Sequence, residues 1–392
     1  MELDPVETRT PTSNTRFVVL DSWRGIAALA ISAFHFRRTT GLDGIPLFDN
    51  LFLSVDFFFV LSGFVISSAY GKRLLGGFSF VKFMWLRFGR VYPLHLAILL
   101  AFITMQMIVV YHARGTGWFP APRESLDTVI GNFLLVHGLN VFPFLTWNKP
   151  SWSISVEFYT YIIFALTIAF VGRKTWLLAL GAMVASPVFL FLFNHGQNID
   201  ATHTYGIVRS LYGFSVGIIC HDIYVRCTAV RSYLKAWVVR GFLLELAVLA
   251  IVLEFITLAG TSILSLVAPL LFGVVVLTFA MEAGLISRLL ALQPFLLLGT
   301  LSYSIYMVHM FILSWWLFMF RAVLQKLGGI NMYETVVQLA KNTIFWEGRN
   351  YPGMVIMTAV IVAVSYGTYF LIEMPSREWS RKMALRFFPV DQ

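Results

Sequence analysis

The chain has 392 residues, of which 58% are hydrophobic and only 12% are charged. Soluble domains are about 45–50% apolar and about 25% charged, so this composition excludes an ordinary soluble protein and indicates a polytopic membrane protein. The formal net charge of +9 is explained by basic cytoplasmic loops and not by nucleic-acid binding, because basic and aromatic residues do not alternate outside the apolar segments. The two cysteines, Cys220 and Cys227, indicate neither a disulfide nor a metal site.

Residues 1–16 are hydrophilic and are expected to form a flexible cytoplasmic tail. A cleaved signal peptide fits less well, because Asp21 and Arg24 interrupt the apolar run that follows. One helical membrane domain is expected over 17–375, followed by a basic cytoplasmic tail at 376–392.

Apolar runs of about 20 residues predict an all-α bundle of about ten transmembrane helices. The expected spans are 17–36, 51–70, 91–111, 151–171, 175–194, 205–222, 239–259, 261–281, 293–318 and 351–373. Segment 127–145 is apolar but broken by glycine and proline, which is compatible with a partly buried or re-entrant segment. The connections 112–150 and 320–350 are long, and loops of such length often have a function.

The distribution of Lys and Arg predicts the orientation of the helices. With the N-terminus inside, about 18 of the 29 basic residues fall on the cytoplasmic side and about 9 on the outer side. This bias follows the positive-inside rule and, with an even number of spans, places both termini in the cytoplasm.

Two ionisable residues, Arg24 and His35, interrupt the first expected span. Their separation of eleven residues places them on one helix face, about 16 Å apart along the axis. A charged side chain near the bilayer centre costs roughly 2.5–3.5 kcal/mol, so such residues mark a function or an internal partner. Arg24 is expected near the cytoplasmic face and His35 near the outer face; packing against acidic residues of neighbouring helices is the alternative.

Other ionisable residues recur at the same two depths. Toward the outer face we expect His35, Asp56, Glu157, Arg209 and His309; toward the inner face, Asp21, Arg24, Arg87, Arg90 and Glu373. Two polar clusters at two depths suit a membrane enzyme with two substrates.

Arg87 and Arg90 are three residues apart, so on a helix they project from one face. Arginine forks bind phosphate oxygens well, and a phosphorylated cytoplasmic substrate is a natural ligand. The alternative is an amphipathic helix that contacts lipid headgroups.

An ordered set of motifs resembles the acyltransferase 3 family of bacterial multispanning acyltransferases. It comprises Arg24 with His35, VDFFFVLSGFVIS with Asp56, Ser62 and Gly63, Arg87 with Arg90, SWSISVEF with Trp152, Ser153 and Glu157, RSLYGFSVG with Arg209, Gly213 and Gly217, LGTLSYSIYMVH with Ser302, Tyr306 and His309, and LIEMP with Glu373 and Pro375. Each motif alone is weak, whereas their order across about 17–375 is specific.

The resemblance implies transfer of an acyl group, most often acetyl, from cytoplasmic acyl-CoA to a hydroxyl of an extracytoplasmic glycan such as exopolysaccharide, capsule or lipopolysaccharide O-antigen. It implies a multi-pass protein of the bacterial cytoplasmic (inner) membrane. Acyl-CoA, the glycan, membrane lipids and glycan assembly machinery are the expected partners. The expected form is a stand-alone one without an appended hydrolase-like domain, and no metal or permanently bound cofactor is expected.

His35 is the expected general base, because acyl transfer must remove the acceptor's hydroxyl proton and imidazole suits that task. Asp56 or Glu157 is expected to orient its ring, and transient acylation of His35 is the alternative. Arg24, together with the Arg87 and Arg90 pair, is expected to bind the phosphates of CoA.

His309 is expected as a second acid or base or as an acceptor-binding group, with hydrogen-bonded packing as the alternative. Arg209, with Trp152, Ser153 and Tyr306, is expected to bind substrate; a structural ion pair is equally compatible with Arg209. Ser62 and Gly63 are expected at close helix contacts. A nucleophilic role for Ser62 lacks a base in the preceding turn.

Two other classes of function remain open from the sequence. A transporter or flippase also needs buried charges, but it predicts an internal repeat that the two halves do not show. An acyltransferase that modifies a small molecule, a lipid-linked sugar, a lipid or a protein would share the chemistry.

Overall fold

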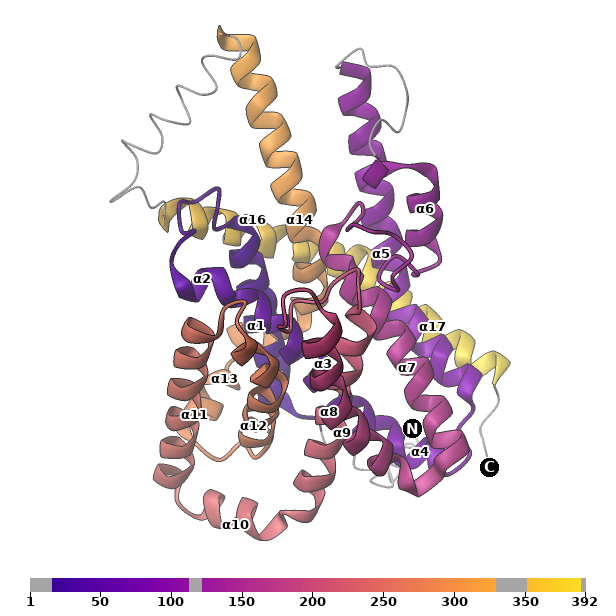
Figure 1. Cartoon of the computed structure of the whole chain (residues 1–392), viewed down its shortest axis with the longest axis vertical. Coiled ribbons are helices and arrows are strands. Elements are labelled where there is room, and N and C mark those ends of the chain that lie inside the picture. Colours follow the sequence, from indigo (N-terminus) through magenta and orange to yellow (C-terminus); the bar gives the residue numbers. More distant parts are fainter. Residues whose placement is uncertain (1–15, 113–121, 329–350, 389–392) are drawn as a thin grey trace, which may run out of the picture.

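A computed structural model describes residues 16–112, 122–328 and 351–388. In these ranges helices joined by irregular connections make up the chain and no strand occurs, which confirms the all-α prediction (Figure 1). The helices are α1 (Val18–Phe36), α2 (Pro46–Asn50), α3 (Ser54–Ile66), α4 (Lys72–Leu75), α5 (Phe80–His112), α6 (Leu126–Phe133), α7 (Trp152–Val171), α8 (Thr175–Phe193), α9 (Gly206–Arg226), α10 (Thr228–Ala236), α11 (Val238–Ala259), α12 (Ala268–Ala280), α13 (Leu285–Leu290), α14 (Gln293–Gly328), α16 (Tyr351–Thr368) and α17 (Met374–Phe387). Single π-helical turns connect α3 to α4 (Ser67–Gly71) and α16 to α17 (Tyr369–Glu373).

Seven helical segments of the described chain are long and apolar enough to cross a membrane, so the protein is a multi-pass membrane protein. One of them, Lys149–Phe193, contains two of the expected spans. Helices α1 and α9 form where spans are expected, but they are not among the seven because their charged and polar side chains lower their hydropathy. The number of crossings and the side on which each end lies stay predictions.

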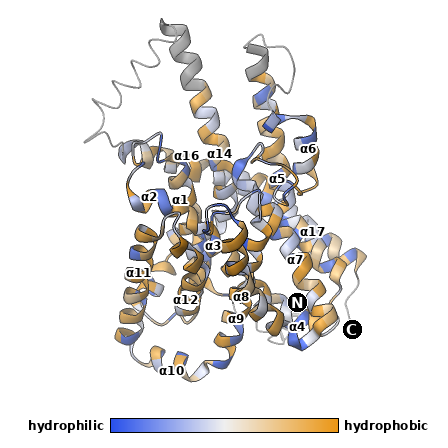
Figure 2. Cartoon of the chain, in the orientation of Figure 1, coloured by the Kyte–Doolittle hydropathy of each residue, from blue (hydrophilic) through white to orange (hydrophobic). Residues whose placement is uncertain are grey.

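Apolar side chains cover the outward surfaces of several helices. On α8, Leu177, Val184 and Leu192 are exposed, and on α11 Leu243 and Ile251 are exposed as well. Figure 2 shows α8, α11 and α12 as largely hydrophobic, while polar residues gather in connecting segments such as α10. Exposed apolar surface on this scale is what a lipid-facing helix requires.

Three boundaries differ from the sequence prediction. Helix α5 begins at Phe80, well before position 91, so Arg87 and Arg90 lie on the spanning helix itself. Helix α14 continues to Gly328, beyond position 318. The expected basic tail at 376–392 is helical as far as Phe387, as part of α17. Residues 1–15 of the expected N-terminal tail and residues 329–350 lie outside the described ranges.

Helices pack at glycines where their backbones come close together. A Cβ added at Gly25 of α1 would lie 2.5 Å from the backbone of Leu298 on α14, and one added at Gly63 of α3 would lie 2.0 Å from the Phe214 carbonyl oxygen on α9. Gly217 meets the Val60 carbonyl oxygen in the same way, at 2.1 Å. Small residues allow such contacts in membrane bundles, so the expected packing role of Gly63 is confirmed.

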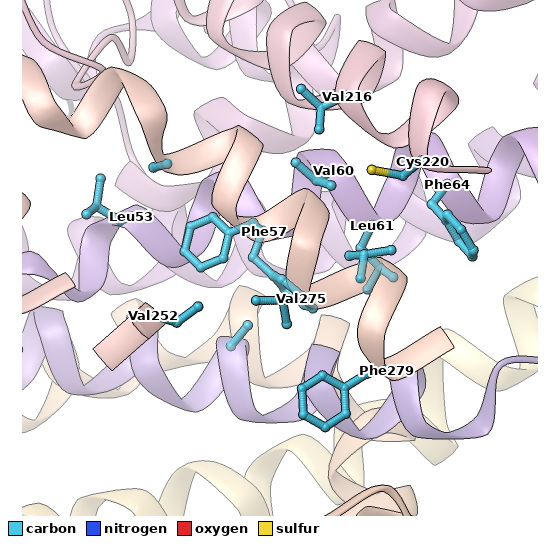
Figure 3. Close-up of a cluster of buried hydrophobic side chains, with 14 of the residues drawn as sticks. Leu53, Phe57, Val60, Leu61, Phe64, Val216, Cys220, Val252, Val275 and Phe279 are labelled. Atoms are coloured by element: carbon cyan, nitrogen blue, oxygen red, sulfur yellow. The ribbon is translucent and has the colours of Figure 1, made fainter. Parts of the chain in front are cut away.

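The apolar core on one side of the bundle joins α3, α9, α11 and α12. In Figure 3, Phe57 and Val60 of α3 point toward Val216 of α9 and Val275 of α12, and all four side chains are buried. This core holds α3 in place, and α3 carries Asp56 and Ser62 toward the polar interior.

Glu245 of α11 caps a helix. Its carboxylate accepts hydrogen bonds from the backbone N–H groups of Gly284, Ile286 and Ser287 at 2.8, 2.9 and 3.1 Å, and from the Ser287 hydroxyl. These N–H groups open α13 and have no partner within the helix. Glu245 thereby fastens α11 to the turn before α13.

Candidate active site

Helices α1 and α14 run side by side through the bundle and carry polar contacts at two levels (Figure 1). At the lower level, Arg24 donates from Nε to the Ser302 hydroxyl at 2.7 Å and from Nη2 to the Gly299 carbonyl at 2.9 Å. At the upper level, His35 meets His309. Since both residues of α1 contact the same neighbouring helix, the predicted common face is confirmed.

The two histidines form a hydrogen-bonded pair. Nδ1 of His35 lies 3.0 Å from the Ile31 carbonyl oxygen and 3.3 Å from Nε2 of His309, while Nδ1 of His309 lies 3.2 Å from the Ile305 carbonyl oxygen. A carbonyl only accepts, so each Nδ1 carries the hydrogen, and this assignment follows from the network. Nε2 of His309 then accepts from His35, and Nε2 of half-buried His35 keeps a free lone pair. A free imidazole nitrogen of this kind is suited to remove a proton.

Below the histidine pair lies a cavity of about 630 Å³, within the size range of small-molecule sites. Six arginines line it, namely Arg16, Arg24, Arg87, Arg90, Arg377 and Arg381, against two carboxylates, Asp21 and Glu157. Part of this charge is compensated, since Asp21 pairs with Arg16 at 2.9 Å and with Arg24 at 3.4 Å. The excess of positive charge favours an anionic ligand over a neutral or cationic one.

Arg87 and Arg90 lie on the wall that α5 contributes. Arg87 donates from Nη2 to the Tyr70 hydroxyl at 3.0 Å, and its Nε is buried without a hydrogen-bond partner. Arg90 makes no hydrogen bond or ion pair within 4 Å to any residue that the structure describes. A buried arginine donor is costly to leave unpaired, so the Nε of Arg87 favours an anionic acceptor at this wall.

Glu157 lies on this cavity and not beside His35, where the sequence placed it. Its Oε1 accepts from the Ser62 hydroxyl at 2.6 Å and from the Tyr161 hydroxyl. The expectation that Glu157 orients the His35 ring is therefore wrong, because two hydroxyl groups hold the carboxylate at the level of the arginines. Ser62 faces the cavity, and its carboxylate partner comes from α7 instead of from the preceding turn of α3.

Asp56 is likewise committed to another partner. Arg209 donates to both of its carboxylate oxygens, from Nε at 2.9 Å and from Nη2 at 2.8 Å, and the side chains are 1% and 0% exposed. The guanidinium carbon also lies over the rings of Phe52 and Trp152, 5.9 and 5.6 Å from their centroids. A buried guanidinium requires a carboxylate partner, so Asp56 does not orient His35 and the buried Arg209 offers no open face to an acceptor. Trp152 packs in this closed cluster.

Ser153 and Tyr306 line the deep end of the cavity. Their hydroxyl groups are 2.7 Å apart, and the Tyr306 hydroxyl also donates to the Pro150 carbonyl at 2.9 Å. The Tyr306 ring lies 5.6 Å from the Phe58 ring and 5.9 Å from the His309 ring, measured between centroids. The cavity thus ends one aromatic layer short of the histidine pair.

The sequence missed several residues of the site. Tyr70, Tyr303, Arg377 and Arg381 line the cavity, and Ile31 sets the tautomer of His35 through its carbonyl. A backbone acceptor leaves no sequence signal. Arg377 and Arg381 did carry one, since they are four residues apart on a basic segment. In the described ranges, no group of three or more His, Cys, Asp or Glu side chains forms a candidate metal site.

Comparison with known families agrees with this arrangement. The model of the acyltransferase 3 family, described as an acyltransferase domain, matches residues 17–372. The chain belongs to this family. It is therefore an acyl-transferring membrane enzyme, and the matched segment contains the histidine pair, Arg24, Arg87 and Arg90.

Three curated proteins illustrate the range of the family. "Protein 2 in picA locus" of Rhizobium radiobacter is 35% identical over 38% of this chain and 81% of its own length. "Acyltransferase MdmB" of Streptomyces mycarofaciens is 32% identical over 45% of this chain and 46% of its own length. "Putative peptidoglycan O-acetyltransferase YrhL" of Bacillus subtilis (strain 168) is 24% identical over 93% of this chain and 56% of its own length. The chain thus spans about half the length of the last two, and no solved structure matches it significantly.

Proposed function

We propose that this acyltransferase takes its acyl group from an acyl-CoA, with acetyl-CoA as the expected donor. It delivers the acyl group to a hydroxyl group of an extracytoplasmic glycan. The observation that carries the proposal is the arginine-lined cavity, which ends one aromatic layer below a histidine with a free Nε2. The arginines at one end of this cavity can bind phosphates, and the other end can hold the acyl group.

CoA matches the cavity in charge and in shape. Its diphosphate and its 3′-phosphate require several cations, and Arg87 and Arg90 present guanidinium groups that the protein itself does not use fully. Arg24 of α1 also lines the cavity and is held by Ser302 of α14. The uncharged pantetheine arm then extends past Ser62 toward Tyr306, with the thioester at the deep end.

His35 would act as the general base in a direct transfer. Its Nε2 accepts the proton of the acceptor hydroxyl, whose oxygen forms a bond to the thioester carbonyl carbon as the carbon–sulfur bond breaks. The CoA thiolate then takes the proton back from His35. The Ile31 carbonyl and His309 hold the Nδ1–H in place and stabilise the imidazolium that forms. Displacement of the Phe58 or Tyr306 ring would connect the cavity to His35.

The acceptor would reach His35 from the side opposite the arginines. Arg24 and His35 lie toward opposite ends of α1, and the charge bias of the loops supports a cytoplasmic position for Arg24. A relative named as a peptidoglycan O-acetyltransferase supports a glycan acceptor. The enzyme would then reside in the cytoplasmic membrane of a bacterium, surrounded by lipid and beside the glycan assembly machinery that delivers its acceptor.

Binding of acetyl-CoA to the purified protein tests the donor side. The double variant Arg87→Gln/Arg90→Gln should weaken binding by about tenfold or more, since a hydrogen bond to a charged group contributes about 1.5–3 kcal/mol. Arg226→Gln is the matched control, because Arg226 is 74% exposed and pairs with Asp222 on the surface. Unchanged affinity in the double variant would assign Arg87 and Arg90 to lipid headgroups.

A further inference from the structure

Helix α17 packs closely along α5, next to the arginine pair. Trp85 donates from Nε1 to the Ser380 carbonyl at 3.0 Å, and the Ser380 hydroxyl donates to the Trp85 carbonyl at 3.2 Å. Gly89 makes this contact possible, since a Cβ there would lie 2.2 Å from the Cβ of Ser380. Lys82 holds the end of the helix through the Phe388 carbonyl at 3.1 Å. The position of α17 is therefore set by the same helix that carries Arg87 and Arg90.

Two arginines of α17, Arg377 and Arg381, line the cavity. They are four residues apart and so project from one face of the helix. The Arg377 side chain is 28% exposed and lies 3.5 Å from the Glu373 carboxylate. That carboxylate also accepts a hydrogen bond from the Ser304 hydroxyl at 2.9 Å. Arg381 is exposed and makes no hydrogen bond or ion pair to a residue in the described part of the chain. Arg381 is thus the freer of the two cations.

Exposure orders the arginines from the mouth of the cavity inward. Arg16 and Arg381 are exposed and Arg377 is half-buried, while Arg87 has a buried Nε. Arg16 is already paired with Asp21 at 2.9 Å, so Arg381 is the exposed cavity arginine that has no acidic partner among the residues described. A CoA molecule has a matching order, since the thioester is followed by the pantetheine arm, the diphosphate and, at the far end, the ribose 3′-phosphate. With the thioester at the deep end, the 3′-phosphate comes to lie at the mouth.

The charge of the donor also requires more cations than α5 supplies. A phosphate monoester carries close to two negative charges at neutral pH, and the diphosphate adds about two more. Arg87 and Arg90 match the diphosphate alone. Arg16 and Arg24 also line the cavity, but both pair with Asp21, at 2.9 and 3.4 Å. Arg377 and Arg381 supply the additional positive charge, and Arg381 has no competing acidic partner among the residues described.

We infer that Arg377 and Arg381 form a subsite for the 3′-phosphate of the donor, which makes the enzyme select CoA over dephospho-CoA. The inference rests on the proposed use of acyl-CoA. Both residues follow position 372, where the match to the family model ends. Phosphate monoester recognition at the mouth gives specificity against other thioesters and against nucleotides that lack this group.

Lipid binding is the competing role for the basic residues of α17. Trp379, Leu385 and Phe387 are exposed apolar side chains of this helix, so it meets the lipid interface as well. A variant of Arg386 can distinguish lipid binding from phosphate binding. Arg386 is exposed on the same helix but is not among the cavity-lining residues, because five positions rotate it by about 140° from Arg381.

The test compares equilibrium binding of CoA and of dephospho-CoA to the purified full chain, with no acceptor present. The unaltered protein should bind CoA at least about tenfold more tightly. Arg381→Gln should lose about tenfold in affinity for CoA and leave the affinity for dephospho-CoA unchanged. Arg377→Gln should do the same, and Arg386→Gln should bind both ligands as the unaltered protein does.

The outcomes separate this inference from the proposed function. Equal binding of CoA and dephospho-CoA by the unaltered protein would overturn the subsite while leaving the acyl-CoA donor intact. An Arg381→Gln protein that keeps its preference for CoA, but binds anionic lipid vesicles more weakly, would assign α17 to the membrane surface and also overturn the subsite. Binding of neither ligand would contradict the proposed donor itself. Thermal unfolding of each variant confirms that it folds, and Arg381→Lys should retain part of the preference.

Discussion

The close contact between α1 and α14 predicts that a single methyl group disables the enzyme. Substitution Gly25→Ala would place a Cβ 2.5 Å from the Leu298 carbonyl carbon and 2.6 Å from the Gly299 nitrogen. These are backbone atoms of α14 and cannot rotate away. Carbon atoms pack at about 3.5–4.0 Å, so the two helices would have to separate by about 1 Å.

That separation acts directly on the site. The bond of 2.9 Å from Arg24 to the Gly299 carbonyl would lengthen beyond hydrogen-bond range. The contact of 3.3 Å between His35 and His309 joins the same two helices and would loosen with it. Overpacking costs about 1–3 kcal/mol of stability, and a displacement of about 1 Å can reduce a catalytic rate about 100-fold.

The assay measures acyl transfer per folded protein, with thermal unfolding in detergent as the second readout. Gly181→Ala is the matched control, since Gly181 lies inside α8 and an added Cβ would meet nothing within 4 Å. We expect Gly25→Ala to lower the unfolding temperature and to reduce transfer about 100-fold, while Gly181→Ala changes neither. A Gly25→Ala protein as stable and as active as the unaltered protein would refute the link between this contact and the site.

Two further predictions concern buried charges. Asp56→Asn should cost about 3–5 kcal/mol of stability, because the buried Arg209 guanidinium loses its bidentate carboxylate and keeps only Asp200, at 3.4 Å. Thermal unfolding checks this, and an unchanged unfolding temperature would contradict the closed ion pair. Glu245→Ala should lower the unfolding temperature, because the backbone N–H groups that it caps lose their partner. Exposed Glu254 of the same helix provides the control variant Glu254→Ala, which should unfold as the unaltered protein does.

Helix periodicity explains how much of the site the sequence could predict. The spacing of Arg24 and His35 fixes their common face on any regular α-helix, and their contacts with α14 confirm it. His309 was expected in the outer half of its span, and it lies beside His35. These predictions needed only the geometry of single helices and their direction across the membrane.

The partners of the carboxylates could not be predicted in this way. Asp56 and Glu157 were assigned to His35 on their expected depth along the membrane, but depth does not specify which neighbour a helix face meets. Rotation of α3 and α7 in the bundle points Asp56 at Arg209 and Glu157 at Ser62. Such rotation depends on packing between distant segments.

The role of α17 was hidden for a related reason. A short basic segment after the last apolar run is typical of a cytoplasmic tail, and the same segment forms a helix when α5 offers it a glycine contact at Gly89. Contact with a distant helix thus converts an expected tail into one wall of the cavity, with Arg377 and Arg381 on its inner face.

The rate of acyl transfer by a His35→Ala variant tests the central claim most directly. The variant is expressed in a bacterial strain that lacks the unaltered gene, and the O-acyl content of its surface and secreted glycans is measured. His195→Ala serves as the control, since His195 is an exposed histidine between α8 and α9. A general base contributes about 10²–10⁴-fold to a rate. We therefore expect His35→Ala to bind acetyl-CoA normally and to leave the glycan without acyl groups; normal acylation by a folded His35→Ala protein would contradict the account.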